Sequence, residues 1–263
     1  MSLTRSPAVA GTFYPSDPDE LCAAVDAYLR DAVAGPSDPP PKALIAPHAG
    51  YVYSGPVAGS AYAQLSELRD RIERVVLIGP SHRVAISGLA TLNAEAFRTP
   101  LGDVPVDLAA VEKLLRFPQV HPLDEAHALE HSLEVHLPFL QRVLGEFSLV
   151  PLVAGEATTA EVAEVLEAVW GGPETLIVVS SDLSHYYDYQ SARDLDAATT
   201  EAIETLDPES LGRESACGRV PIRGLLVVAK RHGLQARTLD VRNSGDTAGP
   251  NDQVVGYGAY AFG

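Results

Sequence analysis

Four short runs of apolar residues, rich in valine, isoleucine and leucine, predict buried strands. They cover residues 43–46, 74–78, 147–153 and 175–180. The runs are continuous and do not alternate with polar residues, which is typical of strands in a parallel sheet that is covered on both faces.

Stretches with helical periodicity separate these runs. Residues 19–33 repeat apolar positions every three or four residues, after Asp17 and Pro18, which suit an N-cap and a first helical residue. Further helices are expected over 54–68, 107–116, 132–144, 159–169, 189–206 and 221–231, with strands over 234–242 and 254–262 and a small antiparallel excursion between 88 and 106. This alternation predicts a three-layer α/β/α fold whose central sheet is largely parallel or mixed.

Length and patterning favour one domain over residues 1–263, with no internal repeat and with a proline-rich loop at 35–41. No apolar run approaches the about 18 residues that span a bilayer, and no secretion signal is recognisable at the start. We therefore expect a cytoplasmic protein with no membrane partner.

Charge and cysteine content narrow the function further. The formal net charge of −16 argues against a nucleic-acid partner, because phosphate binding needs a basic surface. Two cysteines cannot make a disulfide framework. Cys22 lies on a predicted amphipathic helix and suits the core, whereas Cys217 precedes Gly218 in a polar context and is a candidate for chemistry.

Polar side chains with catalytic potential follow three of the predicted strands. His48 comes shortly after the first run, His82 after the second, and Asp182 and His185 after the run at 175–180. The carboxyl ends of parallel strands share one edge of a sheet, so these side chains are expected to converge in a crevice there.

Two histidines and one anionic ligand suit a divalent transition metal that keeps open positions. The third ligand is either Asp182 or the thiolate of Cys217. A metal-free cysteine–histidine nucleophilic pair and a zinc hydrolase, in which the metal activates water, are the alternatives at this point.

The stretch 127–136 is also rich in metal-ligand side chains, but it lacks the HExxH order of a metal-binding helix. An apolar stripe runs through it. We interpret it as a packed, structural helix whose start lines the pocket. Its ionisable residues are His127, Glu130, His131, Glu134 and His136.

Seven motifs, taken together, resemble the Memo family, whose prokaryotic members are also labelled AmmeMemoRadiSam system protein B. They run in order from about residue 5 to 260 and so cover nearly the whole chain. The motifs are PAVAGTFYP from Pro7, APHAGY from Ala46, GPSH from Gly79, EHSLEVHLPF from Glu130, SSDLSH from Ser180, CGR from Cys217 and VVGY from Val254.

The resemblance implies a fold similar to that of class III extradiol dioxygenases of the LigB type, which hold a non-haem iron with two histidines and a carboxylate. His48 and His82 match the metal-site histidines of the family. Cys217 matches the cysteine that stands where the dioxygenases use a glutamate.

The remaining pocket residues also follow from the resemblance. His185 stands at the place of a catalytic acid/base, with Asp182 beside it. The aromatic residues Phe13 and Tyr53 match the walls of the substrate pocket.

The implied function is that of a metal-dependent oxidoreductase or dioxygenase of unknown substrate. Its metal is expected to be Fe²⁺, with copper and zinc as alternatives because a thiolate is a softer ligand than a carboxylate. The alternative function is a non-catalytic binding module whose His/Cys pocket recognises a phosphorylated or acidic peptide or a partner protein. The implied partners are a small-molecule substrate or peptide, an AMMECR-type protein and a radical-SAM protein.

Overall fold

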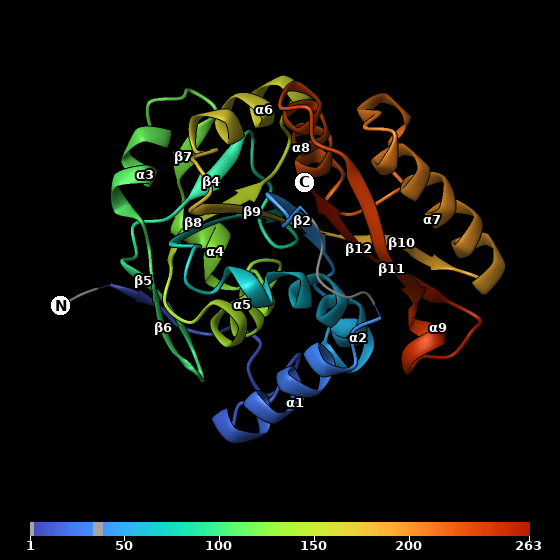
Figure 1. Ribbon diagram of the computed structural model, residues 1–263. Helices are drawn as coiled ribbons and strands as arrows, with labels where there is room; N and C mark the ends of the chain where they lie inside the picture. The colour runs from blue at the N-terminus through green and yellow to red at the C-terminus, as the bar shows by residue number, and fades with distance from the viewer. Residues whose placement is uncertain (1–2, 34–38) are drawn as a thin grey trace.

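The structure, a computed structural model, describes residues 3–33 and 39–263 (Figure 1). Most of the loop predicted at 35–41 therefore lies outside the described residues. The α-helices are α1 (Pro18–Arg30), α2 (Tyr51–Tyr62), α3 (Leu108–Leu114), α4 (Asp124–Ala128), α5 (Leu137–Leu144), α6 (Thr159–Ala168), α7 (Tyr189–Glu204), α8 (Arg219–Arg231) and α9 (Ser244–Thr247). Short 3₁₀ helices span Ala63–Leu68, Glu134–His136 and Pro208–Ser210.

The strands form two sheets. They are β1 (Thr4–Arg5), β2 (Ala43–Ala46), β3 (Arg74–Pro80), β4 (Leu89–Thr91), β5 (Ala96–Thr99), β6 (Gly102–Pro105), β7 (Val120–Pro122), β8 (Ser148–Ala154), β9 (Thr175–Ser180), β10 (Asp182–Tyr187), β11 (Ala236–Asn243) and β12 (Val254–Phe262). The large sheet has the order β10-β12-β2-β9-β3-β8-β4-β7, and β11 also pairs with β12; the small sheet has the order β1-β5-β6.

Helices cover both faces of the large sheet, which confirms the predicted three layers (Figure 1). The four central strands β2, β9, β3 and β8 are parallel, whereas β12 and β4 pair antiparallel at their flanks, so the sheet is mixed. Successive residues of β3 enter opposite cores: Val75 and Leu77 pack toward α1, α2 and α5, and Val76 and Ile78 toward α6 and α8. The expectation of one domain over 1–263 stays a prediction.

The carboxyl ends of three adjacent strands lie level with one another. Ala46 of β2 is the register partner of Ser180 of β9, and Ile78 of β3 pairs with Val179. The segments that follow β2, β3 and β9 therefore leave the sheet side by side, and they carry His48, His82 and Asp182.

The helix expected over 132–144 begins later, because residues 129–133 are not helical and the 3₁₀ helix Glu134–His136 then leads into α5. The Glu130 carboxylate accepts hydrogen bonds from the backbone N–H groups of His131 and Ser132, both at 2.9 Å. These bonds give the backbone an alternative to the helical ladder. The hydroxyl of Ser132 donates to the carbonyl of Pro80 at 2.8 Å and so does not cap a helix.

An N-terminal strap, residues 4–14, is fastened across this stretch by Glu134. The carboxylate of Glu134 is fully buried and accepts from the guanidinium of Arg5, from the backbone N–H groups of Ala8 (2.7 Å) and Val9 (3.0 Å), and from the Tyr14 hydroxyl (2.6 Å). Arg5 also donates to the carbonyl oxygens at positions 127 and 130. Buried hydrogen bonds of Arg5 and Glu134 thus join the strap to the stretch 127–136.

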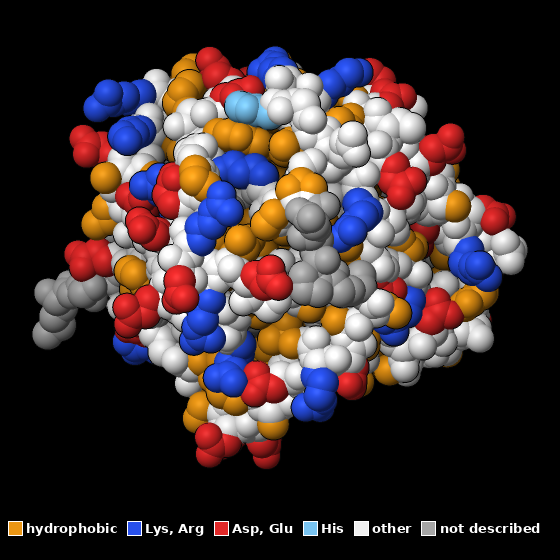
Figure 2. Space-filling model, in the orientation of Figure 1, with side chains coloured by type: hydrophobic (Ala, Val, Ile, Leu, Met, Phe, Trp, Pro, Cys, Tyr) orange, Lys and Arg blue, Asp and Glu red, His pale blue; other side chains and the backbone are white. Residues whose placement is uncertain are grey.

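Charged side chains of both signs are interspersed on the face of the molecule seen in Figure 2. The net charge of −16 is therefore not expressed there as a uniformly acidic surface. Among the described helices, none has the length and hydropathy that crossing a bilayer requires.

Removing the charge of Glu134 should destabilise the fold strongly. Glu134→Gln leaves the buried Arg5 guanidinium without its counter-charge, and we expect a loss of about 3–5 kcal/mol in the free energy of unfolding, measured by urea denaturation. The matched control is Asp103→Asn in the exposed Arg98–Asp103 pair, which should leave the urea midpoint unchanged. Equal effects of the two variants would contradict the role of Glu134.

Candidate metal centre

Three histidines meet beyond the carboxyl ends of the central strands. One donor atom from each of His48, His82 and His131 lies within 4.8 Å of the others. His48 follows β2 and His82 follows β3, so the structure brings together the two histidines that the sequence predicted. His131, which we assigned to a structural helix, is the third member.

The hydrogen bonds of Ser180 fix the tautomer of His48. The Ser180 hydroxyl lies 2.5 Å from the carbonyl oxygen of Ser132, which can only accept, so Ser180 donates there. Nδ1 of His48 lies 2.6 Å from the same hydroxyl and must therefore be the N–H donor. Nε2 of His48 keeps its lone pair, the arrangement usual in a histidine that binds a metal.

Glu130 fixes the tautomer of His82. Nδ1 of His82 donates to the carboxylate at 2.8 Å and its backbone N–H donates at 2.6 Å. Burial raises the pKa of Glu130, but the hydrogen bonds from His82 and from the backbone of Ser132 outweigh burial and lower the pKa to about 2. The carboxylate is therefore ionised at neutral pH, and it leaves Nε2 of His82 free to bind a ligand.

His131 packs between His82 and the strap. Its ring stacks on that of His82 at 4.7 Å and lies 4.9 Å from the ring of Phe13. Burial lowers the pKa of His131 to about 4, with the nearby charge of His82 adding to the effect, so the ring is neutral at pH 7. Its Nδ1 is buried and has no hydrogen-bond partner among residues 3–33 and 39–263.

The chemistry of these donors fits a transition metal. Burial also lowers the pKa of His48, so at least two of the imidazoles are neutral and need not lose a proton before binding. Imidazole nitrogens suit zinc, copper and iron alike. The three imidazoles therefore form a candidate metal site, but they do not determine which metal binds there.

Cys217 lies against His48 at the edge of the three-histidine cluster. Its Sγ is 3.3 Å from Nε2 of His48 and accepts from the backbone N–H of Asp182 at 3.3 Å. Burial, and then the charge of Asp182, raises the pKa of the Cys217 thiol to about 12. Nitrogen and sulfur ligands of one tetrahedral ion lie roughly 3.5 Å apart, so the spacing to His48 is compatible with a shared ion. The assignment of Cys217 as a ligand stays a prediction.

A groove of about 510 Å³ leads to Cys217 from the surface. It runs between the segment 80–87, the segment 154–156 and the start of α8. A small molecule can therefore approach the thiol from the side of the sheet that α8 covers.

Asp182 supports the backbone of His48. Its Oδ1 accepts from the backbone N–H of His48 at 2.8 Å, and its Oδ2 lies 4.0 Å from Nε2 of the same residue. Burial raises the pKa of Asp182 to about 7, although backbone donors of His48 and Ala49 oppose the shift. At neutral pH this carboxyl can therefore both give and take a proton.

His185 lies beside the cluster and is oriented differently from our expectation. We expected Asp182 to orient it, but Nδ1 of His185 donates to the carbonyl oxygen of Leu183 at 2.8 Å. Nε2 of His185 therefore keeps its lone pair. Burial lowers the pKa of His185, so the ring is neutral at pH 7 and can accept a proton.

Of the two predicted wall aromatics, the structure brings one into contact with the histidine cluster. Phe13, on the strap, packs against the ring of His131, and its carbonyl accepts from the backbone N–H of Tyr51. Tyr53 lies in the first turn of α2 with 41% of its surface exposed. Their contact with a substrate stays a prediction.

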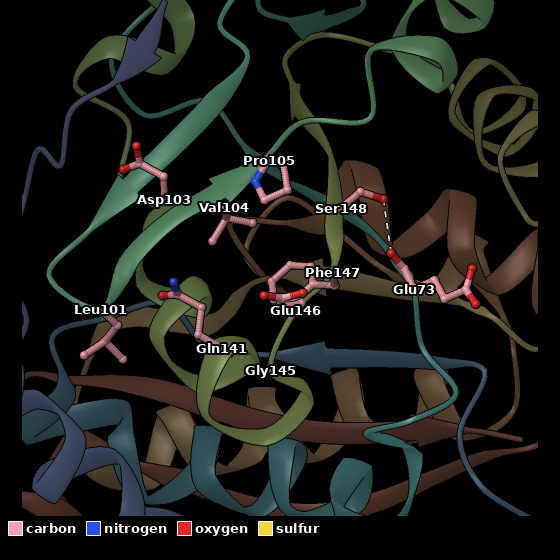
Figure 3. A pocket seen from close by; sticks show the side chains of 10 residues that line it. All are labelled: Glu73, Leu101, Asp103, Val104, Pro105, Gln141, Gly145, Glu146, Phe147 and Ser148. Carbon is pink, nitrogen blue, oxygen red and sulfur yellow. Dashed lines mark hydrogen bonds between the residues drawn. The ribbon is translucent and has the colours of Figure 1, made fainter. Parts of the chain in front are cut away.

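A second hollow, of about 660 Å³, is separate from this centre (Figure 3). It lies between the β5–β6 hairpin, the end of α5 and the start of β8, and a hydrogen bond of 3.1 Å joins Ser148 to the carbonyl of Glu73 at its side. The acidic residues Glu73, Asp103 and Glu146 line it, and the described residues of its lining include no histidine or cysteine. It lacks the ligands that the histidine centre offers.

Fold and site together define an α/β/α protein with a three-histidine candidate metal centre at the carboxyl edge of its sheet. The family profile of the Memo-like proteins matches residues 5–261, and the chain belongs to this family. It is 39% identical to a MEMO1 family protein of Aquifex aeolicus, with 96% of this chain and 97% of the relative covered. A MEMO1 family protein of Methanopyrus kandleri is 38% identical, with 99% of both chains covered.

The number of protons released on metal binding should show whether Cys217 is a ligand together with the three histidines. At pH 8.5 His48 and His131 are neutral and Asp182 is ionised, whereas the Cys217 thiol still holds its proton. We expect roughly one proton released per Zn²⁺ bound by the wild-type protein and close to none by Cys217→Ser, from calorimetry in buffers of different ionisation enthalpy. Equal proton release by both proteins would remove Cys217 from the ligand set.

Proposed function

We propose that the protein is an Fe²⁺-dependent oxidoreductase of the dioxygenase type, acting on a small molecule bound at the histidine centre. The observation that carries this proposal is the cluster of His48, His82 and His131 at the carboxyl edge of the sheet. Fe²⁺ is preferred to zinc and copper because the Memo family resembles extradiol dioxygenases in fold.

His48, His82 and His131 would hold the metal, with Cys217 as a further ligand. A bound Fe²⁺ would supply the redox and Lewis-acid chemistry that a reaction of the substrate with dioxygen needs. Ser180 and Glu130 keep the Nε2 atoms of His48 and His82 directed to that place. His48 is buried whereas His82 is exposed, so a bound metal would stay open to a substrate on the side of His82.

His185 would act as the general base. Its Nε2 is unprotonated at pH 7, because Nδ1 carries the proton that is donated to Leu183 and burial lowers the pKa. A neutral imidazole next to the metal can take the proton that an acidic substrate hydroxyl loses. Asp182, with a pKa raised to about 7 by burial, is a second proton carrier at the same site.

Metal loading and oxygen consumption test the proposal directly. Protein purified anaerobically and loaded with Fe²⁺ should bind one metal per chain and consume oxygen when catechol is added. The His48→Ala/His82→Ala variant should lose both properties. The exposed His121 provides the control, because His121→Ala removes an imidazole outside the site and should change neither.

The outcomes of this experiment distinguish an oxidoreductase from a non-catalytic binding module. Stoichiometric metal in the double variant would overturn the ligand assignment. Normal metal binding by the wild-type protein without oxygen uptake, across a panel of small hydroxylated substrates, would favour a binding module instead.

Replacing His185 should lower the rate of turnover and leave metal binding unchanged. We expect His185→Gln to bind Fe²⁺ normally, since Gln can still donate to Leu183, but to lower the rate of oxygen consumption by roughly 10²- to 10⁴-fold. Metal analysis and oxygen-electrode assays on the same preparation measure the two effects. A matching loss of metal would place His185 among the ligands.

A further inference from the structure

Tyr186 has an unusual backbone conformation for a bulky residue. Its φ is +63°, in the left-handed region, which favours glycine. The only other such non-glycine residue in the described chain is Leu206, which follows the end of α7, where left-handed residues are common. Tyr186 lies within a strand, so helix termination does not account for it.

The irregular backbone places two neighbouring rings on one side. Successive side chains of a regular strand point to opposite faces of the sheet. In β10 the pairing with β12 shifts between Asp182 and His185 and again between His185 and Tyr187. The rings of His185 and Tyr186 consequently lie 5.8 Å apart, edge to face. Irregularities of this kind occur next to active sites, where they redirect a side chain.

The ring of Tyr186 does little for the fold. It is 69% exposed, more than the other large apolar or aromatic side chains of the described residues. Its hydroxyl makes no hydrogen bond within the described ranges 3–33 and 39–263. A strained backbone that presents an exposed aromatic ring beside a proposed base calls for a role outside folding.

A second exposed aromatic residue, Tyr53, follows the histidine site along the chain. Tyr53 belongs to the helix start that follows His48, whose backbone is bonded to Asp182 at the start of β10. Burial, and then Asp182, raises the pKa of Tyr257 on β12. Tyr53 and Tyr186 contribute to the same shift.

We propose that Tyr186 is a specificity-determining residue of the histidine site, and that its ring packs against a planar group of the bound ligand with Tyr53 on the same rim. The inference rests on the proposed function in that it places the ligand at the histidine centre. The class of ligand is a flat molecule with a π face and an oxygen donor. An exposed tyrosine offers such a molecule ring contact at little cost in conformational entropy.

Two anions of equal charge and similar size test the proposal. Benzoate is planar, and cyclohexanecarboxylate is not. The wild-type protein should bind benzoate roughly two- to tenfold more tightly, measured by calorimetry on metal-free and on Zn²⁺-loaded protein. Tyr186→Phe should keep this preference, and Tyr186→Gly should lose it.

Thermal melting separates ligand contact from a structural role. Glycine accepts a positive φ without strain, so Tyr186→Gly should melt at or above the wild-type temperature while losing the preference. Leu206→Gly is the matched control, because it relaxes the other left-handed residue and should keep the preference.

Two results would overturn the role of Tyr186: an unchanged preference in Tyr186→Gly, or a wild-type protein that does not distinguish the two anions in either state. Metal content is measured separately on each sample. Absence of bound metal would contradict the proposed function, while the metal-free titrations would still decide the role of Tyr186.

Discussion

The candidate metal centre depends on one buried carboxylate, that of Glu130. It accepts hydrogen bonds from the side chain and backbone of His82 and from the backbones of His131 and Ser132. A buried carboxylate stays ionised only when such donors replace its water, and these four do so. The same bonds join the end of β3 to the stretch 129–133. Two of the three histidines are therefore positioned by one group that is not itself a member of the cluster.

A second carboxylate, four residues later, fixes the opposite side of the same stretch. Glu134 holds the N-terminal strap, and the strap carries Phe13 against the ring of His131. Arg5 links the two carboxylate systems, because it pairs with Glu134 and donates to the carbonyl oxygen of Glu130. The non-helical course of 129–133 is thus the result of polar groups that are satisfied from both sides. A substitution in the strap should therefore alter the position of His131 through the packing of Phe13, although the strap does not belong to the histidine cluster.

The sequence predicted the part of this site that strand order determines. Apolar runs locate β2, β3 and β9, and parallel pairing then brings His48, His82 and Asp182 to one edge of the sheet. The sequence did not predict His131 as a member of the site, because its place depends on hydrogen bonds that backbone N–H groups donate to Glu130, and such bonds leave no periodic pattern. The available signal was composition: five ionisable side chains in ten residues, 127–136, are too many for a packed helix unless they bind one another or a ligand. Likewise, the orientation of His185 by the carbonyl of Leu183 follows from the irregular backbone of β10, which residue types alone do not specify.

The electrostatics of the centre couple the binding of a metal ion to the protonation of Cys217 and Asp182. Burial keeps His48 and His131 neutral, so a divalent cation there would find charge compensation from Cys217, from Asp182 or from a bound anion, in addition to the ionised Glu130 behind His82. Burial raises the pKa of both of the first two groups, to about 12 for the thiol and about 7 for the carboxyl, because each charge is unfavourable without a partner. A cation supplies that partner and lowers both pKa values. Metal affinity must then rise with pH, and an anionic ligand must bind more readily to the metal-loaded site than to the free one.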